Sequence, residues 1–388
     1  MRLLPFEYGV RNLGRSRVRL ALSVFGSTLV VLLVLAAGAF VRGMDRSLRA
    51  SGGEHNVILL GAGSEESIQR SEIKASVGSL ASASIAGIAT RLGVAYASEE
   101  VHVDLQVRTR PDEEDARLVL IRGVTPRALL VHDTVQMVEG RPPEGGRDEI
   151  MVGALVSTRL GVSPARLSVG NTVWIEEREW TIAGRFVAPG TVMEAEAWMT
   201  LTDVKELTRR DTDSCVVLTL GEAEFADVDT FAKSRLDLEL VAMPEADYYA
   251  KLAAFFRPIR VVTWITAGLI ALGGLLGGLN TMYAAFASRV RELGMLQCLG
   301  FRRGAIVASL TQESVLAASA GSLLACLIAV LTLDGVAVRF SMGAFGLSVD
   351  AGVVALGLLA GLALGMIGAL PPALRALRLP IPEALKAA

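Results

Sequence analysis

Four long apolar segments interrupt a chain in which polar and apolar residues otherwise alternate or mix. The hydrocarbon core of a bilayer is about 30 Å thick, and a helix needs roughly 20 apolar residues to cross it. Segments 20–43, 259–287, 304–333 and 351–374 meet this requirement. Their apolar runs, at 20–41, 261–287, 304–333 and 351–374, contain one charged residue, Glu313. The pattern therefore predicts four transmembrane α-helices.

Between the first and second apolar segments, residues 44–258 have the composition of a globular domain. Residues 101–108 alternate apolar and polar positions, and residues 117–124 follow after a polar turn, which predicts a β-hairpin. A second hairpin is predicted from 173–175 and 180–187. Strand, helix and strand patterns at 215–220, 225–236 and 238–242 predict a β-α-β unit. The fold class expected is thus a membrane protein with a large α+β domain inserted between helices 1 and 2.

Two further patterns concern helix faces. An aromatic and apolar stripe precedes the second apolar segment, at Tyr248, Tyr249, Leu252, Phe255, Phe256 and Ile259. A helix with this stripe either transmits movement into the membrane or simply packs, and Pro258 is a place where it would kink. In the fourth apolar segment Gly357, Gly361 and Gly365 recur every four residues, which predicts a face for close helix packing.

Composition excludes several classes of protein. The chain has 388 residues, of which 52% are hydrophobic and 20% charged, with a mean hydropathy of +0.48. These values exclude a disordered or collagen-like chain. Cys215, Cys298 and Cys326 lie too far apart in the sequence to suggest a disulfide framework.

The distribution of charge predicts the orientation. Arginines cluster in the expected N-terminal segment 1–19, in the connection 288–303 and in the tail 375–388. The positive-inside rule places these three segments in the cytoplasm, so both termini are cytoplasmic and the connection 334–350 is a short external loop. Residues 44–258, with 23 Lys and Arg against 34 Asp and Glu, are then extracytoplasmic. Basic residues beside an anionic bilayer need no nucleic-acid partner.

The first apolar segment has a competing interpretation as a cleaved signal peptide. Arginines precede it, and Ala37-Gly38-Ala39 resembles a cleavage site. Its apolar run of about 22 residues is longer than the usual 7–15 residues of such a peptide. A transmembrane helix is therefore the favoured interpretation.

Candidate catalytic and metal-ligating residues do not form a recognisable motif. His55, His102 and His132 are isolated in the sequence and lack zinc-site spacing, and the acidic turn 112–115 lacks the pattern of a calcium loop. The sequence contains no Gly-Lys dipeptide and so no phosphate-binding loop. We therefore expect no catalytic residue, no metal site and no ATP site in this chain.

Glu313 is a candidate functional residue because a carboxylate inside a membrane is costly. It lies about ten residues into its helix, and no basic residue or second acid accompanies it in the local sequence. A proton relay, polar helix–helix bonding or snorkelling toward the cytoplasmic interface would each explain it, and bonding or snorkelling is the expected explanation.

Segment 288–303 is the most specific candidate site. It has an apolar stripe flanked by arginines at both ends, which predicts a short amphipathic helix that either faces lipid or docks into a cleft of a cytoplasmic partner. The candidate residues are Arg289, Arg291, Glu292, Leu293, Gly294, Met295, Leu296, Leu299, Gly300, Arg302 and Arg303.

This segment resembles the FtsX-like permeases of ABC transporters, including the macrolide-exporter (MacB) and lipoprotein-releasing (LolC/LolE) types. That family has Arg-x-x-Glu-(Ile/Leu)-Gly-(Ile/Met)-Leu-x-x-Leu-Gly followed by basic residues, and all the candidate residues except Arg291 match it. Phe301, Gln297-Cys298 and Gly304 depart from the pattern. Three other parts of the chain are also similar to the family. The first is the amino-terminal Arg11-Asn12-Leu13, and the second is several positions in 139–173 that resemble the MacB-like periplasmic core domain. The third is a carboxy-terminal pattern at Pro372, Ala373, Ala376, Pro382, Glu383, Ala384, Leu385 and Lys386.

The resemblance implies a permease subunit in the bacterial inner membrane. In this family the 288–303 segment is a coupling helix that docks onto a separate ABC ATPase subunit, which binds the ATP. The permease pairs with a second permease chain, as a homo- or heterodimer, and transmits motion to its periplasmic domain (mechanotransmission) for efflux or extraction of a periplasmic or membrane substrate. The alternatives are lipoprotein release and non-transporting regulation of an external hydrolase. A periplasmic adaptor, an outer-membrane channel or a lipoprotein carrier would be further partners.

Overall fold

The computed structural model describes residues 17–113, 116–340 and 343–378, together with Tyr8, Pro380 and Pro382. It divides into two compact units. The helical unit comprises residues 1–42, 258–336 and 347–388, and the strand-rich unit comprises residues 43–257 and 337–346. Several expectations lie outside the described residues, among them the Arg11-Asn12-Leu13 motif, the end of the acidic turn 112–115 and the carboxy-terminal residues Glu383 to Lys386.

Four helices are long and apolar enough to cross a membrane, which confirms the prediction of four such elements. They are α2 (Arg17–Ala50), α9 (Arg257–Ala287), α11 (Arg303–Thr332) and α12 (Ala351–Ala376), and the short helix α10 (Val290–Cys298) lies between α9 and α11. Helix α2 is an uninterrupted helix of 34 residues. It continues beyond the expected residue 43, and its last turns belong to the strand-rich unit.

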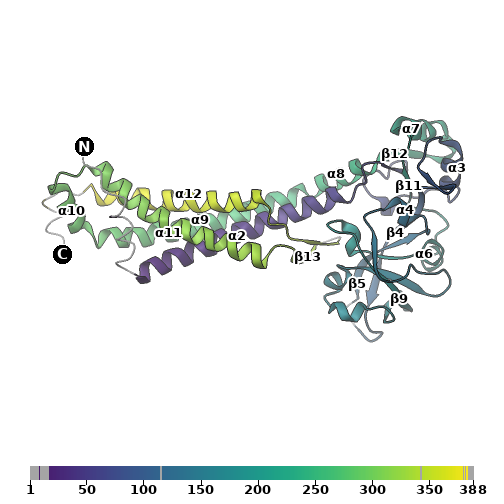
Figure 1. Cartoon of the computed structure of the whole chain (residues 1–388), viewed down its shortest axis with the longest axis horizontal. Helices are drawn as coiled ribbons and strands as arrows, with labels where there is room; N and C mark the ends of the chain where they lie inside the picture. Colours follow the sequence, from purple (N-terminus) through teal and green to yellow (C-terminus); the bar gives the residue numbers. More distant parts are fainter. Residues whose placement is uncertain are drawn as a thin grey trace. The chain divides into compact units, whose positions relative to one another are not determined.

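Within the helical unit, α11 and α12 lie side by side (Figure 1). The glycines of α12 make this possible. A Cβ atom added at Gly365 would lie 2.8 Å from Cα of Val315 on α11, and one at Gly361 would overlap the Ser322 side chain. A Cβ at Gly357 would lie 2.6 Å from Cδ2 of Leu35 on α2. The predicted packing face is confirmed, because each glycine allows a neighbouring helix to approach closely.

The strand-rich unit contains all fourteen strands that the described residues form, twelve of them within residues 43–257. In chain order these twelve are β1 (Asn56–Gly61), β2 (Thr90–Arg91), β3 (Val94–Ala95), β4 (Ala97–Arg108), β5 (Arg117–Val124), β6 (Gln136–Gly140), β7 (Glu149–Gly153), β8 (Thr172–Ile175), β9 (Arg178–Val187), β10 (Ala197–Thr200), β11 (Cys215–Thr219) and β12 (Leu240–Pro244). Its helices are α3 (Val77–Ser84), α4 (Ala128–Val131), α5 (Val156–Leu160), α6 (Leu201–Thr208), α7 (Phe225–Ser234) and α8 (Glu245–Phe255), with 3-10 turns η1 (Ile68–Arg70), η2 (Pro164–Leu167), η3 (Val192–Ala195) and η4 (Leu236–Leu238). The α+β prediction is confirmed.

Strand pairing builds a closed ring and an open extension. Strands β4, β5, β10, β7, β9 and β8 pair in succession, and β8 pairs back onto β4, which closes the ring. Both predicted hairpins, β4–β5 and β8–β9, are antiparallel and are confirmed. On the other side of β4 the sheet continues through β11, β1 and β12. The predicted β-α-β unit is β11–α7–β12, but its two strands do not pair with each other because β1 lies between them, antiparallel to both.

Each part of the sheet has its own apolar core. Inside the ring the side chains of Val101, Ile121, Trp180 and Met199 are fully buried. The open extension packs against α3 and α7, with Val228 of α7 buried in that core. These cores are what alternation predicts, since every second residue of a strand points to the same face.

Two other segments complete the strand-rich unit. The expected short loop 334–350 contains a hairpin, β13 (Ala337–Phe340) and β14 (Gly343–Gly346), and the ring of Phe340 lies 5.3 Å from that of Phe256. The aromatic stripe lies on α8, which ends at Phe255, and α9 begins at Arg257. Its Tyr248, Tyr249 and Phe256 are buried, whereas Phe255 is 73% exposed.

Candidate functional site

The expected amphipathic segment is helical, as α10. The side of α10 that faces the rest of the helical unit consists of Val290, Leu293 and Gly294, which are buried. Leu293 packs in a cluster with Phe286 of α9 and Ile306 of α11, and the half-buried Leu296 packs against the same cluster. Gly300 follows the helix with a positive φ of +88°, a conformation that favours glycine and turns the chain toward α11.

The opposite side of α10 presents apolar and basic side chains to solvent. Met295 is 50% exposed and Leu299 is 65% exposed. Arg291, which is also exposed, lies one helical turn before Met295. Arg291, Met295 and Leu299 therefore form one stripe along the helix. Arg302 and Arg303, at the start of α11, are also exposed. We call Arg291, Met295, Leu299, Arg302 and Arg303 the α10 surface.

An ion-pair network fixes α10 to α11. Arg289 Nη1 lies 3.0 Å from Glu313 Oε2, and both side chains are about nine-tenths buried. Arg289 Nε also donates to Glu292 Oε2 at 3.2 Å, and the Tyr8 hydroxyl donates to Glu292 Oε1 at 2.6 Å. The expectation that Glu313 lacks a basic partner is wrong. Its partner is 24 residues away in the sequence, so the two residues meet through the packing of α10 on α11.

A second group of charged side chains is buried in the strand-rich unit. Arg122 of β5 donates through Nε and Nη2 to both oxygens of Glu196, at 2.7 and 2.8 Å, and through Nη1 to Glu100 of β4 at 2.9 Å. His132 Nε2 lies 2.6 Å from Glu100 Oε1, and His102 Nε2 lies 2.9 Å from Glu100 Oε2. The five side chains form one hydrogen-bonded group, which we call the buried charge cluster.

The protonation states of this cluster follow from its geometry. Burial by itself raises the pKa of Glu100, but the charges of His132 and Arg122 outweigh it and hold that pKa well below its ordinary value. Burial opposes protonation of His132, yet Glu100 raises its pKa, whereas burial lowers the pKa of His102. The raised pKa favours the protonated form of His132 beside Glu100, so the positive charges of Arg122 and His132 oppose the negative charges of the two carboxylates.

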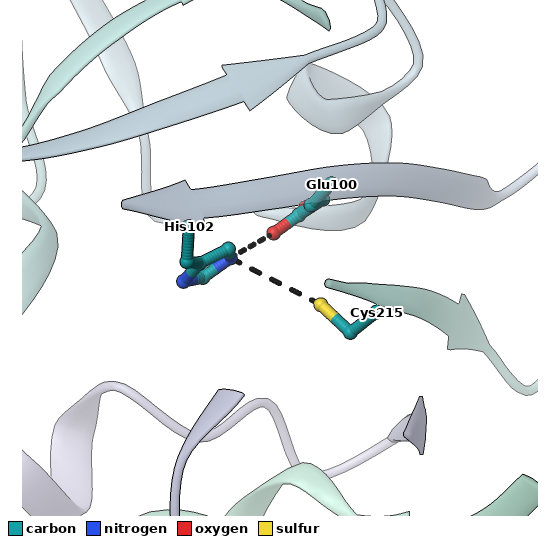
Figure 2. A group of neighbouring side chains, drawn as sticks. All are labelled: Glu100, His102 and Cys215. Carbon is teal, nitrogen blue, oxygen red and sulfur yellow. Dashed lines mark hydrogen bonds and ion pairs between the residues drawn. The ribbon is translucent and has the colours of Figure 1, made fainter. Parts of the chain in front are cut away.

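Part of the cluster resembles a metal site. Glu100, His102 and Cys215 of β11 have ligand atoms within 4.8 Å of one another, and Figure 2 shows the carboxylate and the thiol on the same side of the His102 ring. However, the oxygens of Glu100 already accept hydrogen bonds from Arg122 and His132, and the guanidinium would repel a cation. Burial also raises the pKa of the Cys215 thiol well above its ordinary value, so the thiolate needed for a metal is disfavoured. These side chains fit an ion-pair network better than a metal site.

The sequence predicted isolated surface or strand histidines. His102 does lie in strand β4, but His102 and His132 are not isolated, and that part of the prediction is wrong. They are 5% and 3% exposed and meet at Glu100. One local signal was present: Glu100 and His102 are two residues apart in a strand and so share a face. The valines at alternate positions of β4 predicted that the face opposite Glu100 and His102 is buried. In the structure, both faces of β4 are buried along its first half.

Comparison with known proteins identifies the family. The MacB-like periplasmic core domain model matches residues 20–233, and the FtsX-like permease C-terminal model matches residues 264–381. No curated protein matches the chain.

Two solved structures are similar to the chain at low identity. The periplasmic region of MacB from Actinobacillus actinomycetemcomitans is 10% identical with a TM-score of 0.39, over 52% of this chain and 93% of that one. The extracellular domain of the noncanonic ABC-type transporter YknZ from Gram-positive bacteria is 12% identical with a TM-score of 0.36, over 48% of this chain and 99% of that one. The periplasmic core model alone spans more than half of the sequence, and the protein therefore belongs to the MacB/FtsX-like permease family of ABC transporters.

Proposed function

We propose that this permease couples ATP hydrolysis by a separate ATPase subunit to movement of its strand-rich unit, and so drives efflux or extraction of a periplasmic or membrane substrate. The observation that supports this most directly is the α10 surface. Met295 and Leu299 are half or more exposed on a short helix whose other side is buried. Exposed apolar side chains flanked by arginines fit the cleft of a partner protein.

Two features favour force transmission over a passive docking role. The Arg289–Glu313 ion pair joins α10 to α11, so a displacement of α10 would act on a transmembrane helix. Helix α2 is uninterrupted and contributes residues to both units, whereas α8 ends at Phe255 and a separate helix, α9, begins at Arg257. A continuous helix is a stiff element, which suits α2 to transmit movement.

The proposal places the protein in the bacterial inner membrane, with α10 in the cytoplasm and the strand-rich unit outside. The arginine distribution supports this orientation. A second permease chain, as a homo- or heterodimer, completes the proposed complex. Lipoprotein release and regulation of an external hydrolase are the alternative functions.

The native cysteines provide a test of orientation. Cys298 on α10 is exposed, whereas Cys215 and Cys326 are buried. A membrane-impermeant maleimide should therefore label Cys298 in inverted inner-membrane vesicles but not in spheroplasts. As a control, Leu236→Cys in a Cys298→Ser background introduces a thiol at a side chain that is 81% exposed in the strand-rich unit, and it should show the opposite pattern. Labelling of Cys298 in intact spheroplasts would contradict the orientation.

Docking is tested by the double variant Met295→Asp with Leu299→Asp. Burying an apolar side chain of this size contributes about 1.5–3 kcal/mol, and each aspartate adds the cost of a desolvated charge. We expect ATPase binding to weaken by well over tenfold, since about 1.4 kcal/mol corresponds to tenfold. The measurement is binding of the purified ATPase to the full-length permease in detergent. In the wild type, a second measurement is whether the bound ATPase protects Cys298 from reaction with maleimide.

Leu296 is left unchanged in this test, because its half-buried side chain packs against Ile306 and Phe286 and its loss would disturb folding. The matched control is Val138→Asp with Leu236→Asp, two exposed apolar side chains of the strand-rich unit, 64% and 81% exposed. The control should bind the ATPase like the wild type. Full ATPase binding by a folded Met295/Leu299 variant would refute docking on α10.

A further inference from the structure

The strand-rich unit contains a cavity of about 360 Å³ that the family assignment does not explain. Its walls come from the last turns of α2, from η1, β4, β5 and η3, from α8, and from the β13–β14 hairpin. All of its lining residues belong to this unit, and most of its surface is apolar. The volume lies near the lower end of the range for small-molecule sites.

Aromatic side chains are concentrated around this cavity. The whole chain has 12 Phe, 5 Tyr and 4 Trp, and six of them line it: Tyr248, Tyr249, Phe255, Phe256, Phe340 and Phe345. Successive rings meet edge to face, with centroids 5.3 Å apart for Tyr248–Tyr249 and for Phe256–Phe340. Such walls favour a ligand that itself contains rings, because aromatic groups pack on one another in these geometries.

Two hydroxyl groups at the cavity lack partners. Ser47 Oγ is buried and has no hydrogen-bond partner among the described residues. Tyr249 is 4% exposed, and no hydrogen bond joins its hydroxyl to the part of the chain that the structure describes. The Ser47 oxygen is enclosed by protein, whereas the Tyr249 hydroxyl is not among the enclosed unpaired atoms and belongs to a residue that lines the cavity. The Tyr249 hydroxyl is therefore the group placed to donate to a polar atom of a ligand.

The charges at the cavity do not select a charged ligand. Four charged side chains line it: Glu66, Arg70, Arg122 and Glu196. The Arg122 guanidinium binds both oxygens of Glu196 and, through its remaining nitrogen, Glu100, whereas Glu66 and Arg70 are one acid and one base and are both exposed to solvent. A charged ligand would have to break these bonds or remain unpaired in an apolar site. The lining therefore favours a ligand without net charge.

We propose that this cavity binds an uncharged small molecule with two or three rings and a hydrogen-bond acceptor such as a carbonyl. Its rings pack among Tyr248, Phe256 and Phe340, and its acceptor receives a hydrogen bond from the Tyr249 hydroxyl. That such molecules are transported rests on the proposed function. Binding itself does not, and it is tested without ATP or ATPase.

The probe is benzophenone, which has two rings, a carbonyl and no charge, and which forms covalent adducts with neighbouring C–H groups under light. Full-length permease in detergent is irradiated at increasing benzophenone concentration, and adducts are located by mass spectrometry. Adducts on residues 44–48 and 248–256 should saturate, whereas those on the apolar faces of the membrane helices should rise in proportion to concentration. Proportional labelling everywhere, or no adduct at the cavity, would overturn the proposal.

Variants test the two parts of the site separately. Leu252→Trp places a larger side chain on a half-buried wall residue and should reduce saturable labelling at least tenfold, whereas Leu236→Trp, on the exposed surface, should not change it. Tyr249→Phe should weaken binding of benzophenone about 2- to 10-fold, as for the loss of one hydrogen bond. The Tyr249→Phe variant should not change the affinity for diphenylmethane, which lacks the carbonyl, measured by its competition with benzophenone labelling. Continued burial of Cys215 shows that each variant is folded, and equal effects of Tyr249→Phe on both compounds would overturn the assigned hydrogen bond.

Discussion

Replacing Arg122 with methionine is expected to destabilise the strand-rich unit by about 3–5 kcal/mol, the usual result of removing one partner of a buried ion pair. Arg122 is 2% exposed and binds Glu196 through two nitrogens and Glu100 through a third. Methionine fills much of the same volume but leaves both carboxylates without the guanidinium. His132 still contacts Glu100, so the largest uncompensated charge is that of Glu196.

The fully buried Cys215 reports on this stability. Its modification by a thiol reagent in increasing urea measures opening of the strand-rich unit, and the Arg122→Met variant should become reactive at much lower urea. The matched control is Arg127→Met, because Arg127 is 40% exposed at its side chain and lies 3.8 Å from Glu99, an interaction of about 0–1 kcal/mol. Adding Glu196→Gln to Arg122→Met should recover part of the loss. Equal stability of the two arginine variants would show that the buried charge cluster does not stabilise this unit.

The second large effect is expected at the anchor of α10. In the Arg289→Met variant, the Glu313 side chain, about nine-tenths buried, would lose its 3.0 Å ion pair with Arg289, at an expected cost of about 3–5 kcal/mol. Because the ion pair joins α10 to α11, we expect the loss to appear as local opening of α10. Amide hydrogen exchange in residues 290–298 should then accelerate on the order of 10²- to 10³-fold.

A double-mutant cycle distinguishes the ion pair from general packing. The double variant Arg289→Met with Glu313→Leu removes both charges and should exchange far more slowly than Arg289→Met alone, because no buried charge is left unpaired. Arg303→Met is the control, since Arg303 is exposed and should leave the exchange of α10 almost unchanged. Strictly additive effects of the two substitutions would exclude the ion pair as the anchor.

The candidate site shows how far local patterns reach. The apolar stripe and its flanking arginines predicted a short helix at 288–303, and α10 lies within that segment. The pattern could not separate the eleven candidate residues by role. Leu293 is buried, Arg289 and Glu292 form ion pairs that hold the helix, and Met295 and Leu299 are exposed. This division depends on which side of α10 contacts α9 and α11.

Elements whose cause is local could be predicted from the amino-acid sequence. Bilayer thickness sets the length of an apolar helix, so four apolar runs were enough to predict α2, α9, α11 and α12. Alternation of apolar and polar residues was enough to predict the β4–β5 and β8–β9 hairpins, because neighbouring strands joined by a short turn pair with each other.

Which distant elements meet depends on the packing of the whole chain. Strand β1 enters between β11 and β12, Arg289 reaches Glu313 across 24 residues, and Glu100, Arg122, His132 and Glu196 converge from different segments of the strand-rich unit. Periodicity tells which side of an element avoids water, but it does not name the neighbour that covers that side. A buried charge is stable only beside its partner. The positions of Glu313 and of the two histidines therefore became intelligible only when the packing of whole helices and strands was known.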